Sequence, residues 1–573
     1  AQAIFLLELV LSEGLGGPRA LPPLTNTLLL SSPDMAEKRT TNPVDTLPCT
    51  CWGLIAFFRG VHKKGALKEH RESACTPAKL EVQSLDAPPR DAAVVVDPYS
   101  SGKYLLVELE KRGMPIIVVR SSTKLSQQFL RSHVANSRFW VEMLEFEEFA
   151  GVPELVAALK ALPYNIKGVF GGSEPGVELA DHIANALAMP AANSLELLEA
   201  RKDKAEMQDA LRRNGVPAAE QFKSGSLQEL LAWAQKRNEW PLVAKPTGGA
   251  GSDGVYFCRS LEDLKFAHSN IIGACNPTGK VNSEIALQEY LDGDEYIVDT
   301  VSSEGKHMLV AMWKYTKVKG VPWDDKAILP MQNVLLAPTG ETQDRLVDYV
   351  FKVLDAVGLR YGPCHTEVMF TKRGPILVEV NARLHGLQGP RLIELATGIS
   401  KATYAADVIV GNGDLFHKLY QEGRPGRYLY PRLKQCVQLV LISGEQGYLK
   451  TDIKEALTSL RLPSVVEVLP AVARGDFINR TRDLPTTAGS VLMVHESMEQ
   501  IEADTAKIRE LEESGKLYDV LHEPLASSQE VPPARSRAAT LESVVSSQAG
   551  RVRLDSFEKM DALWAEMNSR PAS

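Results

Sequence analysis

Hydrophobic and polar positions follow a regular order from about Asp91 onward, and the first segments predict a parallel β-sheet. An apolar run at Ala92–Val96 precedes a helical pattern over Tyr104–Arg112 and a second apolar run at Met114–Val119. Strand, helix and strand in this order indicate a crossover connection between parallel strands. Another such unit begins at 166–187, so we predict a small Rossmann-like domain at 89–195.

Helical and strand patterns alternate from Glu196 to about Gly411, and a further α+β module is predicted at 416–522. In that module the periodicity predicts strands at Cys436–Ser443, Val465–Leu469 and Ser490–His495, and helices at Leu449–Leu460 and Ser497–Ser514. The predicted fold class therefore combines α/β and α+β parts.

The two ends of the chain differ in texture from this middle part. Residues 1–88 show no sustained period and hold many Pro, Ser and Thr, which predicts a largely disordered leader. Residues 523–573 begin as a Ser-, Pro- and Ala-rich linker and end in an amphipathic helix, whose apolar face holds Leu554, Phe557, Leu563, Trp564 and Met567. We expect this helix to dock on its own protein, with a partner-binding helix as the alternative.

Composition and charge narrow the classes of partner and compartment. The chain has 573 residues, 44% apolar content and a net charge of −8, and it lacks a long Lys/Arg block, which argues against nucleic acid or an anionic membrane as partner. No apolar run approaches the roughly 20 residues that span a bilayer. The seven scattered cysteines predict free thiols in a reducing compartment. Cytoplasm is the expected location. Because the first residue is Ala1, the true start is taken as missing or processed, and an organelle stays open.

A glycine-rich loop follows a lysine that ends a short strand. Pro241–Pro246 is apolar except for Lys245, and residues 247–254 return through four glycines into a strand at Val255–Cys258. Glycines let backbone N–H groups approach phosphate oxygens, and lysine adds a point charge. A Gly-rich hairpin with a surface lysine is the alternative. A helix that carries Lys204 and ends near Gly215 precedes this loop; taken alone, it is an ordinary charged helix.

The segment Ile285–Asp299 reads as strand, short glycine turn and strand. Backbone groups near Glu289–Leu291 can read the edge of a base, and a carboxylate just after the turn can reach ribose hydroxyls. An ordinary β-hairpin is the alternative reading of the same pattern.

A second hairpin holds the sharpest pattern. Its strands are His365–Phe370 and Ile376–Arg383, and the strand period of two puts Glu379, Asn381 and Arg383 on one face. His365 and Glu367 likewise share a face. Carboxylate and amide oxygens suit Mg²⁺, and a guanidinium can hold a transferring phosphoryl group. A solvated polar face is the alternative.

These four elements, in this order, resemble the ATP-grasp superfamily. The resemblance covers about 89–520. Within the superfamily, the chain resembles the branch of L-amino-acid ligases and carnosine-synthase-like enzymes. Three segments carry this likeness: Val-Asp-Pro-Tyr-Ser-Ser-Gly at 96–102, Gly-Ser-Glu-Pro-Gly-Val-Glu-Leu-Ala at 172–180 and Glu-Val-Asn-Ala-Arg-Leu at 379–384. It implies an ATP-grasp domain of two α+β subdomains at 196–415.

The resemblance also implies roles for individual residues. ATP phosphates would be bound by Lys204, Lys245 and a flap that includes Gly249, Gly251, Ser252 and Gly254. Adenine would be held by Gln288, Glu289, Tyr290 and Leu291, and ribose by Glu295. Mg²⁺, or alternatively Mn²⁺, would be coordinated by Glu367, Glu379 and Asn381. Arg383 and Lys245 would act on the transferring phosphoryl group.

Two positions depart from the family pattern. Gln288 stands where an acidic residue is common, and Leu384-His385-Gly386 stands where a Gly-Gly pair borders the acceptor site. His385, His365 and Lys317 are weaker candidates for substrate contacts.

The function that the resemblance implies is an ATP- and Mg²⁺-dependent carboxylate–amine ligase, which forms an amide through an acyl phosphate on amino acids or small peptides. A non-catalytic ATP-binding protein and an ATP-grasp carboxylase are the alternatives, and a homo-oligomer stays open. A nicotinamide dehydrogenase is a poor fit, because residues 97–102 lack the G-x-G-x-x-G spacing.

Overall fold

A computed structural model describes residues 88–125, 136–249, 253–422 and 429–522. The predicted leader at 1–88 lies almost wholly outside these ranges, as do the predicted linker and terminal helix at 523–573 and the loop residues Gly251 and Ser252. Every helix in the described ranges is too short or too polar to cross a membrane.

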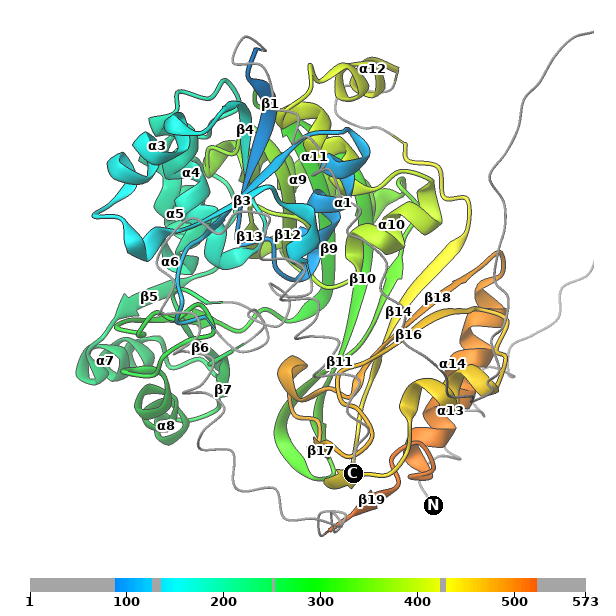
Figure 1. Cartoon of the computed structure of the whole chain (residues 1–573). Coiled ribbons are helices and arrows are strands. Elements are labelled where there is room, and N and C mark those ends of the chain that lie inside the picture. Colours follow the sequence, from blue (N-terminus) through cyan, green and yellow to red (C-terminus); the bar gives the residue numbers. More distant parts are fainter. Residues whose placement is uncertain (1–87, 126–135, 250–252, 423–428, 523–573) are drawn as a thin grey trace, which may run out of the picture. The chain divides into compact units, whose positions relative to one another are not determined.

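The first described elements form the predicted parallel sheet (Figure 1). Its order is β3-β2-β1-β4, with β1 at Arg90–Val96, β2 at Ile116–Arg120, β3 at Glu142–Glu145 and β4 at Tyr164–Gly171. Successive side chains of β1 point to opposite faces, so both faces must be covered. Ala92 and Val94 pack with α3 (Val152–Ala161) and α4 (Val177–Ala186), whereas Ala93 and Val95 pack with α1 (Lys103–Lys111).

A second, antiparallel sheet has the order β5-β8-β6-β7. Its strands are β5 (Gln221–Ser224), β6 (Leu242–Pro246), β7 (Tyr256–Cys258) and β8 (Ile285–Glu289). Leu230 of α7 (Leu227–Arg237) and Leu264 of α8 (Leu261–Ile271) share a core with Leu242 and Leu287 of this sheet. The sheet therefore has one face buried by two helices.

The third sheet is antiparallel and eight-stranded, in the order β13-β12-β9-β10-β11-β14-β18-β16. Its strands run in chain order over Gly293–Ser303 (β9), Lys306–Val321 (β10), Asp324–Leu335 (β11), Gly362–Thr371 (β12), Gly374–Asn381 (β13), Gln435–Leu441 (β14), Val465–Pro470 (β16) and Gly489–His495 (β18). Apolar residues of α9 (Glu341–Ala356) belong to the core of this sheet. The prediction of a fold with α/β and α+β parts is thus confirmed.

Strands of the predicted C-terminal module continue the same sheet. Gln332 of β11 pairs with Leu439 of β14, and β14 pairs along its whole length with β18. The helices α13 (Ile453–Ser459) and α14 (Met498–Glu513) share a core with these strands (Figure 1). The domain limits drawn from the sequence stay a prediction.

The helix expected to carry Lys204 is interrupted. It is split into α5 (Leu198–Lys202) and α6 (Lys204–Arg213), because Asp203 takes an extended backbone (ψ 121°). The Asp203 carboxylate accepts hydrogen bonds from the N–H groups of Ala205 and Glu206, as a helix N-cap does. Lys204 is consequently the first residue of its helix.

Other described elements complete the chain. Helices α10 (Gly389–Thr397), α11 (Lys401–Ile409) and α12 (Asp414–Glu422) follow β13, and β17 (Phe477–Ile478), β15 (Gly447–Leu449) and β19 (Val520–Leu521) form a small sheet. Short 3-10 helices lie at Ser100–Gly102, Ser137–Phe139, Phe146–Glu148, Glu174–Gly176, Leu195–Leu197 and Leu484–Thr486.

Candidate nucleotide and metal site

The hairpin of β12 and β13 brings the predicted metal ligands together. Glu367 pairs directly with Glu379, and His365 pairs with Asn381. Directly opposed residues of an antiparallel pair carry their side chains on the same face. Three of these four side chains offer hard oxygen donors on one short stretch of sheet, as Mg²⁺ requires.

Two buried lysines face this hairpin from other elements. Lys204 Nζ lies 2.9 Å from Glu379 Oε1 and 3.1 Å from the carbonyl oxygen of Gly249. Burial opposes its charge, but Glu379 and the more distant Glu174 raise the pKa of Lys204 above its usual value. Its ammonium group is therefore a cation already seated against a predicted metal ligand.

Lys245 lies at the end of β6, and its Nζ donates to the carbonyl oxygen of Val378 at 3.4 Å. Burial, together with the neighbouring charge of Lys204, lowers the pKa of Lys245 to about 8. Two ammonium groups held close together without a full set of carboxylate partners are suited to bind an anion such as a phosphate.

The donor set fits a divalent cation. Glu367 is held ionised: burial opposes this, but hydrogen bonding from His365 and the charges of Lys317 and Arg383 lower the pKa of Glu367 to about 2. Glu379 is paired with an ammonium group, and Asn381 turns its amide oxygen toward a guanidinium. Each predicted oxygen ligand thus already lies beside a positively charged group, and Mg²⁺ would provide a positive charge of the same kind at this place.

Arg383 is fixed by three acceptors. Its Nε donates to Glu174 Oε2 at 2.8 Å, Nη2 to Asn381 Oδ1 at 3.0 Å, and Nη1 to the carbonyl oxygen of Leu384 at 3.0 Å. Glu174 begins a 3-10 helix directly after β4 of the parallel sheet. Sequence reasoning missed Glu174; its signal was an acidic residue in a glycine-containing loop at the carboxyl end of a parallel strand, where ligands commonly bind.

The segment predicted as an adenine hinge connects two different sheets. β8 belongs to the four-stranded sheet and β9 to the eight-stranded sheet, and they do not pair with each other, so the alternative of an ordinary hairpin is wrong. Gln288 is buried, and its amide nitrogen donates to Gln221 Oε1 at 2.9 Å. A connection between two sheets is well placed to border a bound molecule.

The side chain of Glu289 is used within the protein. Its carboxylate accepts hydrogen bonds from Arg373 Nη2 at 2.6 Å and from the N–H of Glu220 at 2.9 Å. Tyr290 packs edge-to-face on Phe257, with ring centroids 5.8 Å apart. Adenine contact by Gln288, Glu289, Tyr290 and Leu291 stays a prediction, in which the backbone of this connection is the part best suited to the base.

Glu295 is buried and forms an ion pair with the partly exposed Lys317, whose Nζ lies 2.6 Å from Glu295 Oε1. Burial opposes the charge of Lys317, but Glu295 raises its pKa above the usual value. The ribose contact predicted for Glu295 and the substrate contact predicted for Lys317 therefore fall on one pair of side chains.

Glycines of the predicted flap adopt conformations that favour glycine. Gly249 has φ +107° and Gly254 has φ +67°, both in the left-handed region. A Cβ atom on Gly254 would lie 3.0 Å from Cγ of Pro246. Glycine at these two positions therefore lets the loop beside Lys245 take its present backbone conformation.

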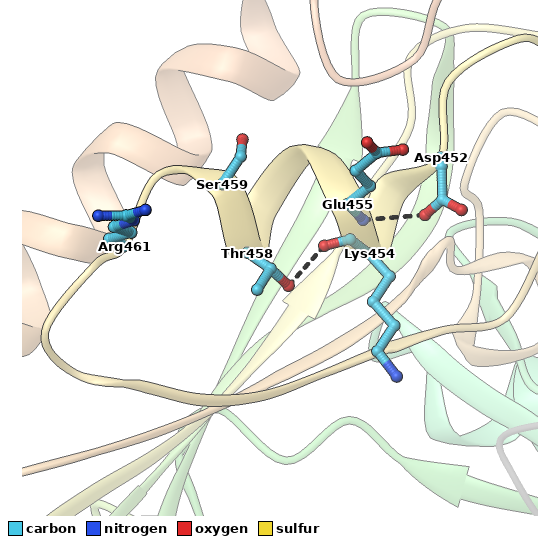
Figure 2. A pocket seen from close by; sticks show the side chains of 6 residues that line it. All are labelled: Asp452, Lys454, Glu455, Thr458, Ser459 and Arg461. Atoms are coloured by element: carbon cyan, nitrogen blue, oxygen red, sulfur yellow. Dashed lines mark hydrogen bonds between the residues drawn. The ribbon is translucent and has the colours of Figure 1, made fainter. Parts of the chain in front are cut away.

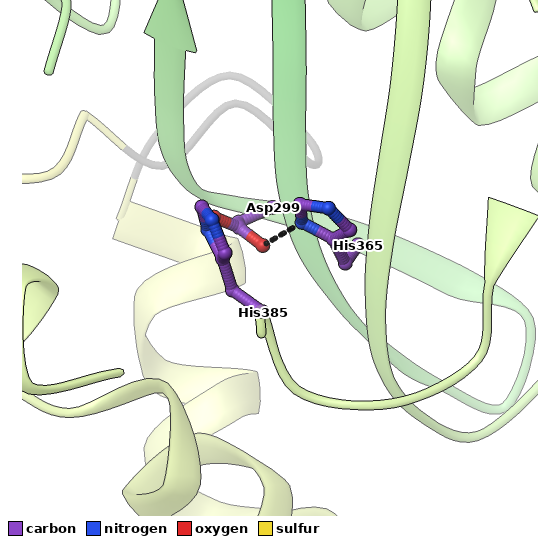
Figure 3. Close-up of side chains that lie close together, drawn as sticks. All are labelled: Asp299, His365 and His385. Carbon is purple, nitrogen blue, oxygen red and sulfur yellow. Dashed lines mark hydrogen bonds and ion pairs between the residues drawn. The ribbon is translucent and has the colours of Figure 1, made fainter. Parts of the chain in front are cut away.

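Asp299 lies at the centre of a cluster of buried polar side chains that the sequence did not predict. In the sequence this residue stood out only as the end of the segment Ile285–Asp299. Asp299 is fully buried in β9 (Figure 3). Its Oδ1 accepts from Lys401 Nζ at 2.7 Å, and its Oδ2 accepts from His385 Nδ1 at 2.8 Å and from Trp313 Nε1 at 2.9 Å. Burial opposes ionisation, but Lys401 holds the pKa of Asp299 well below its usual range.

The two histidines predicted as weaker substrate contacts belong to this cluster. Their ring centroids lie 4.3 Å apart, and only 5% of His365 and 6% of His385 is exposed. Burial lowers the pKa of His385 to about 4, so its ring is neutral and Nδ1–H donates to Asp299. Substrate contact by these histidines stays a prediction.

A shallow hollow of about 510 Å³ lies along α13 and is lined by none of the predicted site residues (Figure 2). It is lined by Asp452, Lys454, Glu455, Thr458, Ser459 and Arg461. Asp452 caps the helix through the N–H of Glu455, and Thr458 Oγ1 donates to the carbonyl oxygen of Lys454. These polar groups serve the helix itself, so the hollow offers no converging chemistry.

Comparison with known proteins supports the predicted family. A family model described as an ATP-grasp domain matches residues 238–390. Dapdiamide A synthase from Enterobacter agglomerans is 28% identical over 427 residues, which cover 74% of this chain and 96% of that protein. The matched region, residues 238–390, is thus an ATP-grasp domain.

Two further similar proteins are named as amino acid ligases. An L-arginine-specific L-amino acid ligase from Bacillus subtilis is 27% identical over 239 residues, covering 41% of this chain and 51% of that enzyme. The crystal structure of an L-amino acid ligase from Bacillus licheniformis superposes with a TM-score of 0.56 at 18% identity, covering 74% of this chain and 98% of that one. The predicted superfamily and its resemblance to L-amino-acid ligases are confirmed.

Proposed function

We propose that this ATP-grasp protein joins a carboxylate to an amine at the expense of ATP, through an acyl phosphate, and that its substrates are amino acids or small peptides. The observation that carries the proposal is the convergence of Lys204 and Arg383 on the paired strands that hold Glu367 and Glu379. The names of the relatives, a dapdiamide synthase and amino acid ligases, support the substrate class.

In the proposed reaction a carboxylate oxygen attacks the γ-phosphorus of ATP, and the bond to ADP breaks. The amine nitrogen then attacks the acyl carbon, phosphate leaves, and the amine gives up its proton. Lys204 and Lys245 would hold phosphate oxygens, and Arg383 would hold the transferring phosphoryl group. Glu174 and Asn381 would keep the guanidinium plane of Arg383 fixed. Mg²⁺, held by Glu367, Glu379 and Asn381, would neutralise phosphate charge when bound.

No enzyme nucleophile is needed in this scheme, since catalysis rests on positioning and on charge neutralisation. The buried lysines and Arg383 are preorganised by protein acceptors, which reduces the cost of orienting them during reaction.

Phosphate release is the measurement that tests the proposal. Purified protein with ATP and Mg²⁺ should release phosphate only when both a carboxylate and an amine are present, and the product should contain a new amide by mass spectrometry. Glu379→Ala should abolish this turnover, whereas Glu455→Ala, an exposed glutamate on α13, should leave it unchanged.

Two alternative functions are separated by the same assay. ATP binding without phosphate release across a broad panel of amino acid pairs would favour a non-catalytic ATP-binding protein. Phosphate release that depends on bicarbonate, with a carboxylated product, would favour an ATP-grasp carboxylase.

A further inference from the structure

The Asp299 cluster reaches the predicted metal hairpin through one side chain. His365 Nε2 lies 3.3 Å from Glu367 Oε1, and His365 Nδ1 lies 3.5 Å from Asp299 Oδ1. The second distance is an ion-pair contact rather than a good hydrogen bond. His365 therefore stands between a fully buried carboxylate and a predicted ligand of Mg²⁺.

The cluster is costly to build for stability alone. Lys401 and Asp299 have no exposed surface, and taking both charges out of water offsets most of their attraction. Lys401 begins α11, whereas Asp299 lies in β9 and His385 follows β13. Lys401, His385 and Trp313 thus donate to one carboxylate from three other parts of the chain, and His365 lies beside the same carboxylate.

A metal ion at the cluster itself is the competing explanation. One ligand atom each from Asp299, His365 and His385 lie within 4.8 Å of one another, which is close enough to share an ion (Figure 3). However, Lys401 Nζ already lies 2.7 Å from Asp299 Oδ1. A metal here would place a second cation beside a buried ammonium group, so Lys401 takes the part of the counter-ion.

We infer that Asp299 and Lys401 are positioning residues: they hold His365, and through it Glu367, in the orientation in which Glu367 meets Mg²⁺. The inference rests on the metal site of the proposed function. It gives the buried histidines a role inside the protein instead of contact with substrate. Partners that orient a metal ligand in this way commonly affect metal affinity when they are removed.

The test removes both charges together, because a single change would leave the other charge buried and unpaired. In Asp299→Asn/Lys401→Met the fold should persist, with a thermal transition close to that of the wild type. Binding of Mn²⁺ in the presence of ADP, followed by electron paramagnetic resonance, should weaken by about 10-fold or more. The Mg²⁺ concentration for half-maximal phosphate release should rise in parallel, and excess Mg²⁺ should restore turnover.

A control variant removes another ion pair, which is partly buried. Arg509 Nη1 and Glu512 Oε2 are 2.5 Å apart on α14, so Arg509→Met/Glu512→Gln makes the same change in charge elsewhere. This control should keep wild-type Mn²⁺ affinity even if its thermal transition falls.

The outcomes separate this inference from the proposed function. If the wild type and Asp299→Asn/Lys401→Met bind Mn²⁺ with the same affinity, the inference is overturned and the proposed metal site is kept. Wild-type protein that binds no Mn²⁺ with ADP would overturn both. Stoichiometric zinc in the purified wild-type protein, lost in His385→Ala, would overturn the inference in favour of a metal held by the cluster.

Discussion

Lys204 Nζ lies 2.9 Å from Glu379 Oε1, although the lysine begins α6 and the glutamate lies in β13. The contact joins a residue predicted to bind phosphate to one predicted to bind Mg²⁺. In a ligase of the proposed kind, Mg²⁺ and a phosphate oxygen would separate this pair, and each partner would keep an opposite charge beside it.

Lys204→Gln should therefore impair ATP use more than folding. We expect kcat/KM for ATP to fall about 100-fold or more, because a preorganised charge on the phosphates is lost. Phosphate release measures the effect, and the exposed Lys454→Gln serves as the control. Wild-type kcat/KM in Lys204→Gln would contradict a role for this lysine in binding ATP.

Arg383→Lys should slow turnover even though the positive charge is kept. A lysine ammonium cannot reproduce the planar fork that contacts Glu174 and Asn381 at once. We expect kcat to fall about 100-fold while the thermal transition stays near that of the wild type. Arg391→Lys, on the exposed side of α10, should behave like the wild type, and equal kcat values for the two variants would contradict the assignment.

The lowered pKa of Lys245 predicts opposite pH trends for ATP use and for the free energy of unfolding. The pKa of Lys245 is lowered to about 8 in the folded protein, mainly by burial, from an ordinary value of 10.5. The charged form is lost as pH rises through about 8, so kcat/KM for ATP should fall there. Lys245→Arg should flatten this limb of the profile, because arginine stays charged.

The same group affects the free energy of unfolding in the other direction. Between the folded pKa near 8 and the unfolded pKa near 10.5, the unfolded chain binds more protons, so this group's contribution makes stability rise with pH. Below pH 8 the cost of burying its charge is fully present. Urea unfolding at pH 8 and pH 10, compared between wild type and Lys245→Met, isolates this contribution; equal pH dependence of both proteins would contradict the lowered pKa.

Gly254→Ala should destabilise the sheet that holds Lys245. Its φ of +67° is strained for alanine, and the new Cβ would lie 3.0 Å from Pro246 Cγ. The expected loss is about 1–3 kcal/mol, seen as a lower thermal transition. Gly248→Ala is the matched control, since nothing lies within 4 Å of its added Cβ. A loss in Gly248→Ala as large as that in Gly254→Ala would argue against backbone strain as the cause.

Parts of the site followed from the sequence because they depend on local geometry. The strand period of two determines that Glu379, Asn381 and Arg383 share one face, and a short turn limits how β12 can pair with β13. The opposition of Glu367 and Glu379 was therefore within reach. The parallel sheet followed for a similar reason, since its strand–helix–strand order allows few topologies.

Other relationships depend on packing between distant segments. Lys401 and Asp299 carry no local signal that links them to the metal hairpin, yet they pair with each other beside it. The loop that holds Glu174 has a local signal for a ligand site, but that signal does not show that Glu174 meets Arg383. The pairing of β11 with β14 likewise joins strands that the sequence pattern had assigned to separate parts of the chain.

The chain's own pattern thus determined the strands, their polar faces and the types of ligand that they offer, because backbone periodicity is local. The tertiary structure decided which charge meets which. The partners of ion pairs such as Lys204–Glu379 and Lys401–Asp299 lie far apart in the chain, so only the packing of separate elements brings them into contact.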